Sequence, residues 1–221
     1  MNLFFPQVCE ACNNALSDNE LVICTKCRHD LPATNYHFEN AEAVKKVLYG
    51  RVKLENATAL LHFTKKGTVQ QLLHNLKYRG HEHIGGFLGK WLGTELQSIE
   101  AYKQIEVVIP VPLYKTKLRK RGYNQVEQFG KAIAKALDAE YNDRVLVKTI
   151  PTKTKVFESR ITRWNDDGAI FKLSENTSLK AKHVLLVDDI ITTGATIEAC
   201  ATELLKIDNI KLSLATMAIA D

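Results

Sequence analysis

The feature that most constrains this chain is an apolar run that leads into two acidic residues and a turn of small residues. Residues 184–187 read Val-Leu-Leu-Val, which is typical of a strand buried on both faces of a parallel sheet. Asp188 and Asp189 follow where this strand is expected to end. After the turn, apolar residues between Ile197 and Leu205 recur at helical spacing. This order predicts an open α/β sheet with a ligand site at the carboxyl end of the strand.

The turn between the acidic pair and the helix has the composition of an anion site. Its backbone N–H groups can converge at a helix N-terminus, where unpaired donors and the helix dipole favour a phosphate. Asp188 and Asp189 repel phosphate, but they can accept hydrogen bonds from sugar hydroxyls or hold a hydrated Mg²⁺. Together these features predict a ribose 5-phosphate ligand. The alternative is an ordinary connection in which the acids only cap the helix. The turn consists of Thr192, Thr193, Gly194, Ala195 and Thr196.

Residues 187–196 resemble the phosphoribosyl-diphosphate (PRPP) binding motif of type I phosphoribosyltransferases. The resemblance implies that Asp188 and Asp189 bind the ribose hydroxyls and that the 192–196 turn surrounds the 5-phosphate. It also implies Mg²⁺ bound together with PRPP. The alternation of expected strands and helices independently favours the same fold class, an α/β fold whose mostly parallel sheet has helices on both faces.

Four of the five cysteines form two Cys-x-x-Cys pairs within the first thirty residues. Two such pairs, separated by eleven residues, can place four thiolates tetrahedrally around one Zn²⁺. The alternatives are disulfides, which are rare in a cytosolic chain, and a redox pair, which would not occur twice. Few apolar residues surround the pairs, so the predicted zinc ribbon needs its metal to fold. The predicted ligands are Cys9, Cys12, Cys24 and Cys27, whereas Cys200 is predicted to be a core residue.

The net charge of +5 over 221 residues is modest, but the positive charge is concentrated. Five cations lie between residues 115 and 121, and a looser basic segment that runs to about residue 167 predicts a loop able to close over a ligand. Such clusters suit diphosphates or nucleic acid, and the alternative is a solvated surface. The side chains predicted to bind a diphosphate are Lys115, Arg121 and Arg163, with Arg163 in a catalytic role beside Asp188 and Asp189.

Three parts of the chain are similar to the ComF family of phosphoribosyltransferase-like proteins, which is linked to competence for DNA uptake. They are residues 73–80, residues 109–113 together with 121–125, and the four-cysteine ribbon. The chain departs from the family pattern ahead of Arg163, where the family often has Thr and Gln. Here Lys153, Thr154, Lys155 and Glu158 occupy that region and Gln is absent, which implies altered or weakened chemistry if the loop takes part in catalysis.

These patterns predict three regions: a zinc ribbon over 1–35, a helical connector or hood over 36–104, and a phosphoribosyltransferase core over 105–221. Two functions stay open, namely phosphoribosyl transfer and non-catalytic binding of single-stranded DNA alongside other DNA-uptake proteins. In the second, Tyr114, Tyr123 or Trp164 would stack on bases. A cytoplasmic protein is expected, because no apolar run is long enough to span a bilayer and no secretory signal is visible.

One further motif, His81-Glu82-His83, could suggest a metal site. However, residues two apart do not share a helical face, and no further ligand is near in the sequence. These histidines are therefore predicted to be surface or capping residues.

Overall fold

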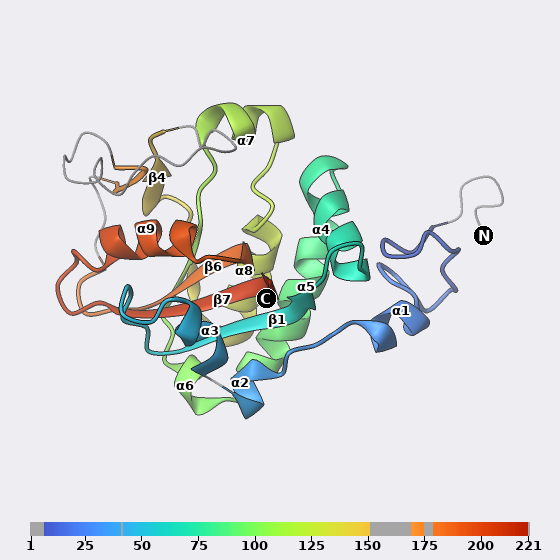
Figure 1. Cartoon of the computed structure of the whole chain (residues 1–221), viewed down its shortest axis with the longest axis horizontal. Coiled ribbons are helices and arrows are strands. Elements are labelled where there is room, and N and C mark those ends of the chain that lie inside the picture. The colour runs from blue at the N-terminus through green and yellow to red at the C-terminus, as the bar shows by residue number, and fades with distance from the viewer. Residues whose placement is uncertain (1–6, 41, 151–168, 175–178, 221) are drawn as a thin grey trace.

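A computed structural model describes residues 7–40, 42–150, 169–174 and 179–220 (Figure 1). Its main sheet has five strands in the order β1-β7-β6-β2-β3, and every neighbouring pair is parallel. This arrangement confirms the predicted fold class. The strands are β1 (Ala57–Phe63), β2 (Val107–Pro110), β3 (Glu140–Tyr141), β6 (His183–Ile191) and β7 (Lys211–Ala220).

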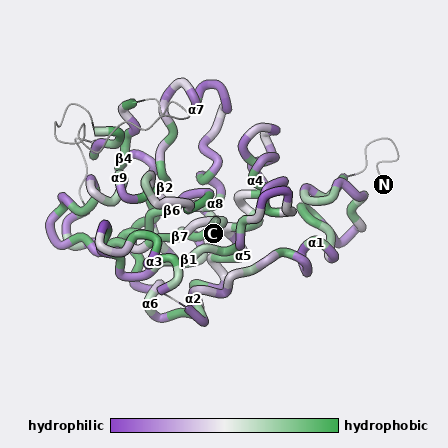
Figure 2. Tube along the Cα trace, in the orientation of Figure 1, coloured by the Kyte–Doolittle hydropathy of each residue, from purple (hydrophilic) through white to green (hydrophobic). Residues whose placement is uncertain are grey.

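The sheet is apolar on both faces because successive side chains of a strand point to opposite sides. Leu185 and Val187 of β6 belong to one buried cluster. Val184 and Leu186 belong to a second cluster on the other face. Figure 2 shows that hydrophobic residues gather along the sheet. The first cluster includes α4 (Thr68–Tyr78), α5 (His83–Leu96) and α8 (Glu127–Leu137), and the second includes α3 (Glu42–Val47) and α9 (Ala195–Leu204).

Helices α5 and α8 approach each other closely through glycines. A Cβ added at Gly89 would lie 2.5 Å from the carbonyl oxygen of Phe129, and one at Gly93 would lie 2.8 Å from the Cβ of Ala136. Both distances are too short for real carbon contacts. The glycines therefore allow backbone-to-backbone packing that a larger residue would prevent.

The structure corrects several expected boundaries. Strand β6 continues to Ile191, so the acidic pair lies within the strand instead of after it. The basic cluster forms a helix, α7 (Lys115–Arg121), which ends at Gly122 with φ of +87° and is one of the hydrophilic segments in Figure 2. Strand β4 (Leu146–Lys148) does not join the main sheet and pairs antiparallel with β5 (Phe171–Leu173) in a separate sheet.

The basic segment that was predicted to close over a ligand falls mainly outside the described residues. This applies to the predicted role of Arg163, to the stacking role for Trp164, and to the departure from the family pattern at Lys153, Thr154, Lys155 and Glu158.

The N-terminal ribbon contains the short helix α1 (Thr25–Asp30) and an isolated bridge between Val8 and Ala15. Its residues Cys9 and Ile23 are buried in the same cluster as α4 and α5, so the ribbon packs on the body of the protein. The segment that follows contains α2 (Tyr36–Glu39).

Strand β1 comes from the region predicted to be a connector, yet it pairs with β7 in the main sheet. The short helix α6 (Glu100–Lys103) precedes β2. The region boundaries at 35 and 104 stay predictions. Within the described ranges, no helix has the length and apolar character needed to cross a bilayer.

Candidate functional site

The two acidic residues of β6 are nearly buried and differ in their partners. Asp188 and Asp189 retain only 8% and 5% of their exposure. The Asp189 carboxylate lies 2.7 Å from the Lys77 ammonium and accepts a 2.6 Å hydrogen bond from Nε2 of Gln125. The Asp188 carboxylate accepts a 2.8 Å bond from the amide of Asp189. Asp189 therefore has a full counter-charge, whereas none of the described residues places a counter-charge in contact with Asp188.

Burial is the largest cause that raises the pKa of Asp188 to about 8, and the negative charge of Asp189 is the second. The more distant charges of Lys77 and Lys148 act in the opposite direction. Burial in the ligand-free protein therefore favours the protonated form of Asp188. A bound cation, or hydroxyl donors placed beside it, would favour its carboxylate form.

The turn after β6 leaves backbone donors free at the start of α9. Gly194 is buried at φ of +77° and gives α9 no side-chain cap. Among the residues that the structure describes, none accepts a hydrogen bond from the amide N–H of Thr196 or Ile197. A hollow of about 50 Å³ is lined by this turn. The predicted residues at its rim are exposed, namely Thr192, Thr193, Ala195 and Thr196.

Residues far away in the sequence brace the outer side of this turn. The Arg51 guanidinium donates a 2.9 Å hydrogen bond to the carbonyl of Thr193 and lies 2.8 Å from the carboxylate of Glu198. A Cβ on Gly194 would lie 2.6 Å from the Cδ2 of Leu48. Both the positive φ and this contact therefore require glycine at position 194. Nothing local in the sequence indicates the role of Arg51 or Leu48.

A hollow of about 340 Å³ lies between the end of α4 and α7. Arg121 donates a hydrogen bond to Gln125, which in turn contacts Asp189, so the predicted residue Arg121 is connected to the acidic pair. Lys115, also predicted, is exposed at the start of α7 and does not line the hollow. The lining side chains include Lys77, Tyr78, Lys117, Lys120, Arg121 and Tyr123.

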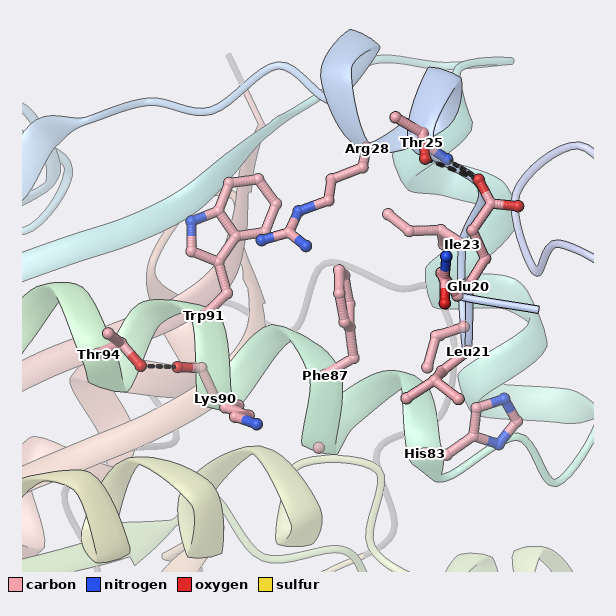
Figure 3. A pocket seen from close by; sticks show the side chains of 13 residues that line it. Glu20, Leu21, Ile23, Thr25, Arg28, His83, Phe87, Lys90, Trp91 and Thr94 are labelled. Atoms are coloured by element: carbon pink, nitrogen blue, oxygen red, sulfur yellow. Dashed lines mark hydrogen bonds between the residues drawn. The ribbon is translucent and has the colours of Figure 1, made fainter. Parts of the chain in front are cut away.

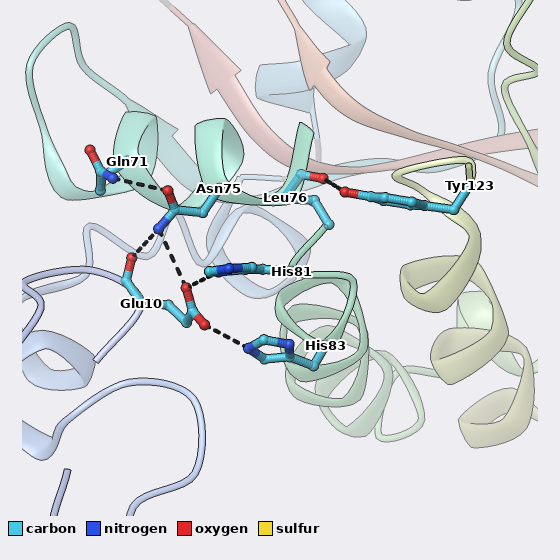
Figure 4. Close-up of polar contacts among 7 residues, drawn as sticks. All are labelled: Glu10, Gln71, Asn75, Leu76, His81, His83 and Tyr123. Atoms are coloured by element: carbon cyan, nitrogen blue, oxygen red, sulfur yellow. Dashed lines mark hydrogen bonds and ion pairs between the residues drawn. The ribbon is translucent and has the colours of Figure 1, made fainter. Parts of the chain in front are cut away.

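Tyr123 cannot take the base-stacking role considered for it, because its ring is 8% exposed and its hydroxyl donates to the carbonyl of Leu76 (Figure 4). Sequence reasoning assigned no role to Lys77 or Gln125. Both stand within stretches 73–80 and 121–125 that carry the family resemblance, which is the signal that could have found them.

The four N-terminal cysteines form a cluster that could hold a metal ion. Their sulfurs all lie within 4.8 Å of one another, and those of Cys12 and Cys24 are 3.8 Å apart. A tetrahedral ion with metal–sulfur bonds of about 2.3 Å places its sulfurs about 3.8 Å apart, so the geometry fits. Burial and then the neighbouring sulfurs raise the pKa of Cys27 well above its usual range. A cation at the centre would remove this cost.

Glu10 lies between the first two cysteines and joins the ribbon to α4 and α5 (Figure 4). Its carboxylate is 2.5 Å from Nδ1 of His81 and 2.8 Å from Nε2 of His83. The buried amide of Asn75 donates 2.9 Å to the Glu10 carbonyl. The two histidines are thus half-buried or exposed residues with a docking role, which the prediction of surface or capping residues missed.

A groove of about 500 Å³ separates the rest of the ribbon from α5 (Figure 3). Phe87 and Trp91 of α5 line it together with Ile23 and Arg28 of the ribbon, and Glu20 on the ribbon side accepts 2.5 Å and 2.8 Å hydrogen bonds from the amide and hydroxyl of Thr25. No predicted site residue lines this groove.

Comparison with known proteins agrees with this geometry. The family model described as "Phosphoribosyl transferase domain" matches residues 127–221. "DNA utilization protein YhgH" of Shigella flexneri is 23% identical over 202 residues, covering 90% of this chain and 84% of its own. "Competence protein ComFC" of Streptococcus pneumoniae is 30% identical over 135 residues, covering 61% and 56%. The chain is thus similar to the competence and DNA utilization proteins of the ComF family, and its C-terminal part matches a phosphoribosyl transferase domain.

Two further proteins are also similar to this chain. "Competence protein F" of Haemophilus influenzae is 26% identical over 140 residues, covering 62% of this chain and 61% of its own. A solved adenine phosphoribosyltransferase superposes with a TM-score of 0.40 at 17% identity, over 69% of this chain and 75% of the other. The family model begins at α8 and includes both acidic residues and the whole turn, whereas the ribbon and α4 precede it.

Proposed function

We propose that this protein binds a phosphoribosyl ligand, PRPP or ribose 5-phosphate, at the end of β6. The 5-phosphate would accept hydrogen bonds from the turn at the start of α9, and the ribose hydroxyls would contact Asp188 and Asp189. The free N–H groups of Thr196 and Ile197, beside two acids at the end of a parallel strand, carry the proposal. An ordinary helix cap requires neither the second acid nor the exposed threonines.

The same arrangement supports phosphoribosyl transfer. The lone pair of an acceptor nitrogen would form a bond to C1 of the ribose, while the C1–O bond breaks and its electron pair leaves with the diphosphate. The proton on the nitrogen would pass to solvent. Asp188 and Asp189 would hold Mg²⁺, which would supply charge neutralisation for the leaving diphosphate. Lys115, Arg121 and Arg163 are the proposed diphosphate contacts, with Arg163 outside the described residues.

Titration calorimetry with PRPP and Mg²⁺ tests the ligand assignment. The double variant Asp188→Asn with Asp189→Asn should lose about 100-fold in affinity or more, because two charge-assisted contacts disappear. The matched control is Asp143→Asn with Asp208→Asn, which removes two exposed acids elsewhere. Both proteins must show the circular dichroism of the wild type. A folded Asp188→Asn, Asp189→Asn protein that binds PRPP as tightly as the control would eliminate the proposal.

For the cysteine cluster we propose structural zinc, bound by Cys9, Cys12, Cys24 and Cys27. Four protein ligands leave no open position for chemistry, and a four-sulfur tetrahedron suits Zn²⁺. Elemental analysis of the purified protein should find zinc at about one ion per chain. The Cys200→Ala variant lacks a thiol outside the cluster and should retain the same metal content. Iron in place of zinc would refute the identity, though not the site.

A second candidate function is binding of single-stranded DNA by the outer face of α7. Lys115 and Arg119 are four residues apart, exposed, and absent from the lining of the α4/α7 hollow. Relatives named for DNA utilization and competence favour this candidate. Changing both residues to Ala should reduce the salt slope of strand binding by roughly 1.4, that is about 0.7 for each lost phosphate contact. The Lys131→Ala, Lys135→Ala protein is the charge-matched control, and a wild type that shifts no strand at low salt would exclude the candidate.

A further inference from the structure

We infer that the hollow between α4 and α7 selects an acceptor with an aromatic ring and a negative charge. The inference rests on the proposed function, because it assigns the second substrate of the same site. The hollow is about 340 Å³, which suits a single ring system with its substituents. This hollow differs in size and in its lining residues from the small hollow at the turn.

The charge of the hollow is one-sided. Four cations line it, and no carboxylate does. Lys77 is already neutralised by Asp189 at 2.7 Å. Within the described part of the chain, Lys117 and Lys120 have no carboxylate partner. Two unpaired ammonium groups facing one cavity favour an anion and disfavour a neutral ring.

Helical geometry separates these cations from the rest of the basic cluster. Lys117, Lys120 and Arg121 stand at i, i+3 and i+4 of α7, so they share one face, and that face lines the hollow. Lys115 and Arg119 lie on another face and do not line it. The cations that line the hollow are therefore a different set from the cations on the outer face of α7.

The hollow also offers one exposed aromatic ring, that of Tyr78, which contacts the ring of His74 at a centroid distance of 5.1 Å. Tyr78 is 69% exposed, and the Arg121 guanidinium lies 5.8 Å from the centre of its ring. This pair forms a stacked edge against which a planar ligand can lie. The ring of Tyr123 is buried and its hydroxyl is engaged, so it forms the floor.

A polar chain connects the hollow with the ribose site. Arg121 donates to Gln125, Gln125 donates to Asp189, and Asp189 pairs with Lys77, so both ends of the chain line the hollow. An occupant of the hollow would consequently lie beside the sugar bound to the acidic pair. This is the position that an acceptor for the phosphoribosyl group requires.

Matched ligand pairs test the charge requirement by calorimetry. The pairs are nicotinate with nicotinamide, orotate with uracil, and adenosine monophosphate with adenosine, each measured with and without PRPP and Mg²⁺. The anionic member should bind about tenfold or more tightly than its neutral partner in at least one pair, as expected for one charge-assisted contact. The carboxylate and phosphate pairs distinguish the two sources of charge. Equal binding within every pair, or no binding by any anionic ring up to about 1 mM, would overturn the inference.

Variants of the lining side chains test which of them cause the preference for an anionic ring. Lys117→Ala with Lys120→Ala should abolish the difference between anionic and neutral rings, whereas Lys131→Ala with Lys135→Ala on α8 should retain it. Tyr78→Ala should weaken both members of a pair by about fivefold to tenfold through lost stacking, and Tyr78→Phe should not. A charge preference that persists in the Lys117→Ala, Lys120→Ala protein would place the anion site elsewhere and refute the inference.

PRPP binding is measured separately on the same proteins. The Lys117→Ala, Lys120→Ala protein should bind PRPP within about threefold of the wild type, because the turn and the acids are unchanged. If the wild type fails to bind PRPP, the proposed function fails, while the ring preference measured without PRPP still decides what the hollow binds. If PRPP binds and no pair shows a preference, only the present inference fails.

Discussion

The turn at the start of α9 and the cysteine ribbon both bring several donor atoms to one point, but their rigidity has different sources. The turn follows a strand that is apolar on both faces and is braced by Arg51 and Leu48. Among the described residues of the ribbon, the buried apolar ones are Cys9, Ile23 and Leu31, and four sulfurs lie within 4.8 Å without a bond between them. On the functions proposed above, the sheet would hold the turn ready for its ligand, whereas the ribbon would need its ion to be ordered.

Removing the metal should produce the largest difference in stability between the ribbon and the turn. In reducing buffer with a chelator, the ribbon should unfold locally while the sheet persists, since metal binding supplies the ribbon's folding free energy. Amide hydrogen exchange should show that protection between Cys9 and Cys27 falls by a factor of about 100 or more, with little change in β6. Ribbon amides that keep their protection after complete metal removal would contradict the dependence described here.

Gly89→Ala should damage the body of the protein and leave the ribbon's metal site intact. The new Cβ would meet backbone atoms of Phe129, and we expect a loss of about 2–4 kcal/mol in the free energy of unfolding after the helix-propensity gain. Gly86→Ala on the same helix is the control, because its nearest neighbour would be 3.9 Å away, and it should gain up to about 1 kcal/mol. Urea unfolding measures both, and equal effects of the two changes would disprove the close contact.

Asp188→Asn should stabilise the ligand-free protein at alkaline pH while weakening PRPP binding. The native pKa of about 8 lies above the ordinary value of 3.8, so the unfolded state loses its proton first and stability falls as pH rises between them. Asparagine removes that loss. We expect a gain of about 1–3 kcal/mol at pH 8 that shrinks toward pH 4.

Urea titrations of Asp188→Asn, of the exposed-site control Asp143→Asn and of the wild type at both pH values measure this gain. The control should show no pH-dependent difference from the wild type. A variant that is no more stable than the wild type at pH 8 would show that Asp188 is already ionised in the native protein.

Glu10→Gln should have the smallest effect of these changes. It should separate docking of the ribbon on α5 from metal binding by the ribbon. The variant keeps all four cysteines but loses the charged acceptor shared by His81 and His83, which should weaken ribbon docking by about 1–2 kcal/mol. Exchange should quicken in the ribbon and at the start of α5, with metal content unchanged. Glu100→Gln, an exposed change on α6, serves as the control, and a loss of metal in the Glu10→Gln protein would mean that Glu10 supports the cluster and not the docking.

Sequence patterns predicted the features that depend on local order. The apolar run of β6, the acidic pair that follows this run and the paired cysteines are all visible in short windows, because burial on both faces and ligand spacing leave local signatures. The continuation of β6 through the acidic pair to Ile191 was not predicted. Helix α7 was missed because its seven residues contain one apolar side chain, Leu118, and therefore no periodicity. The pairing of Lys77 with Asp189 joins residues 112 positions apart, and no local pattern encodes it.

The position of the first strand has a practical consequence for dividing this molecule. Strand β1 pairs along β7, and Leu48 lies against Gly194. Both β1 and Leu48 precede residue 105, where the predicted core begins. An excised piece that begins there would leave the backbone of β7 without its neighbour and would invite edge-to-edge association between copies. The acidic pair and the turn after β6 consequently cannot be studied in a fragment that begins at residue 105. Studies of ligand recognition need the longer polypeptide that carries residues 42–63.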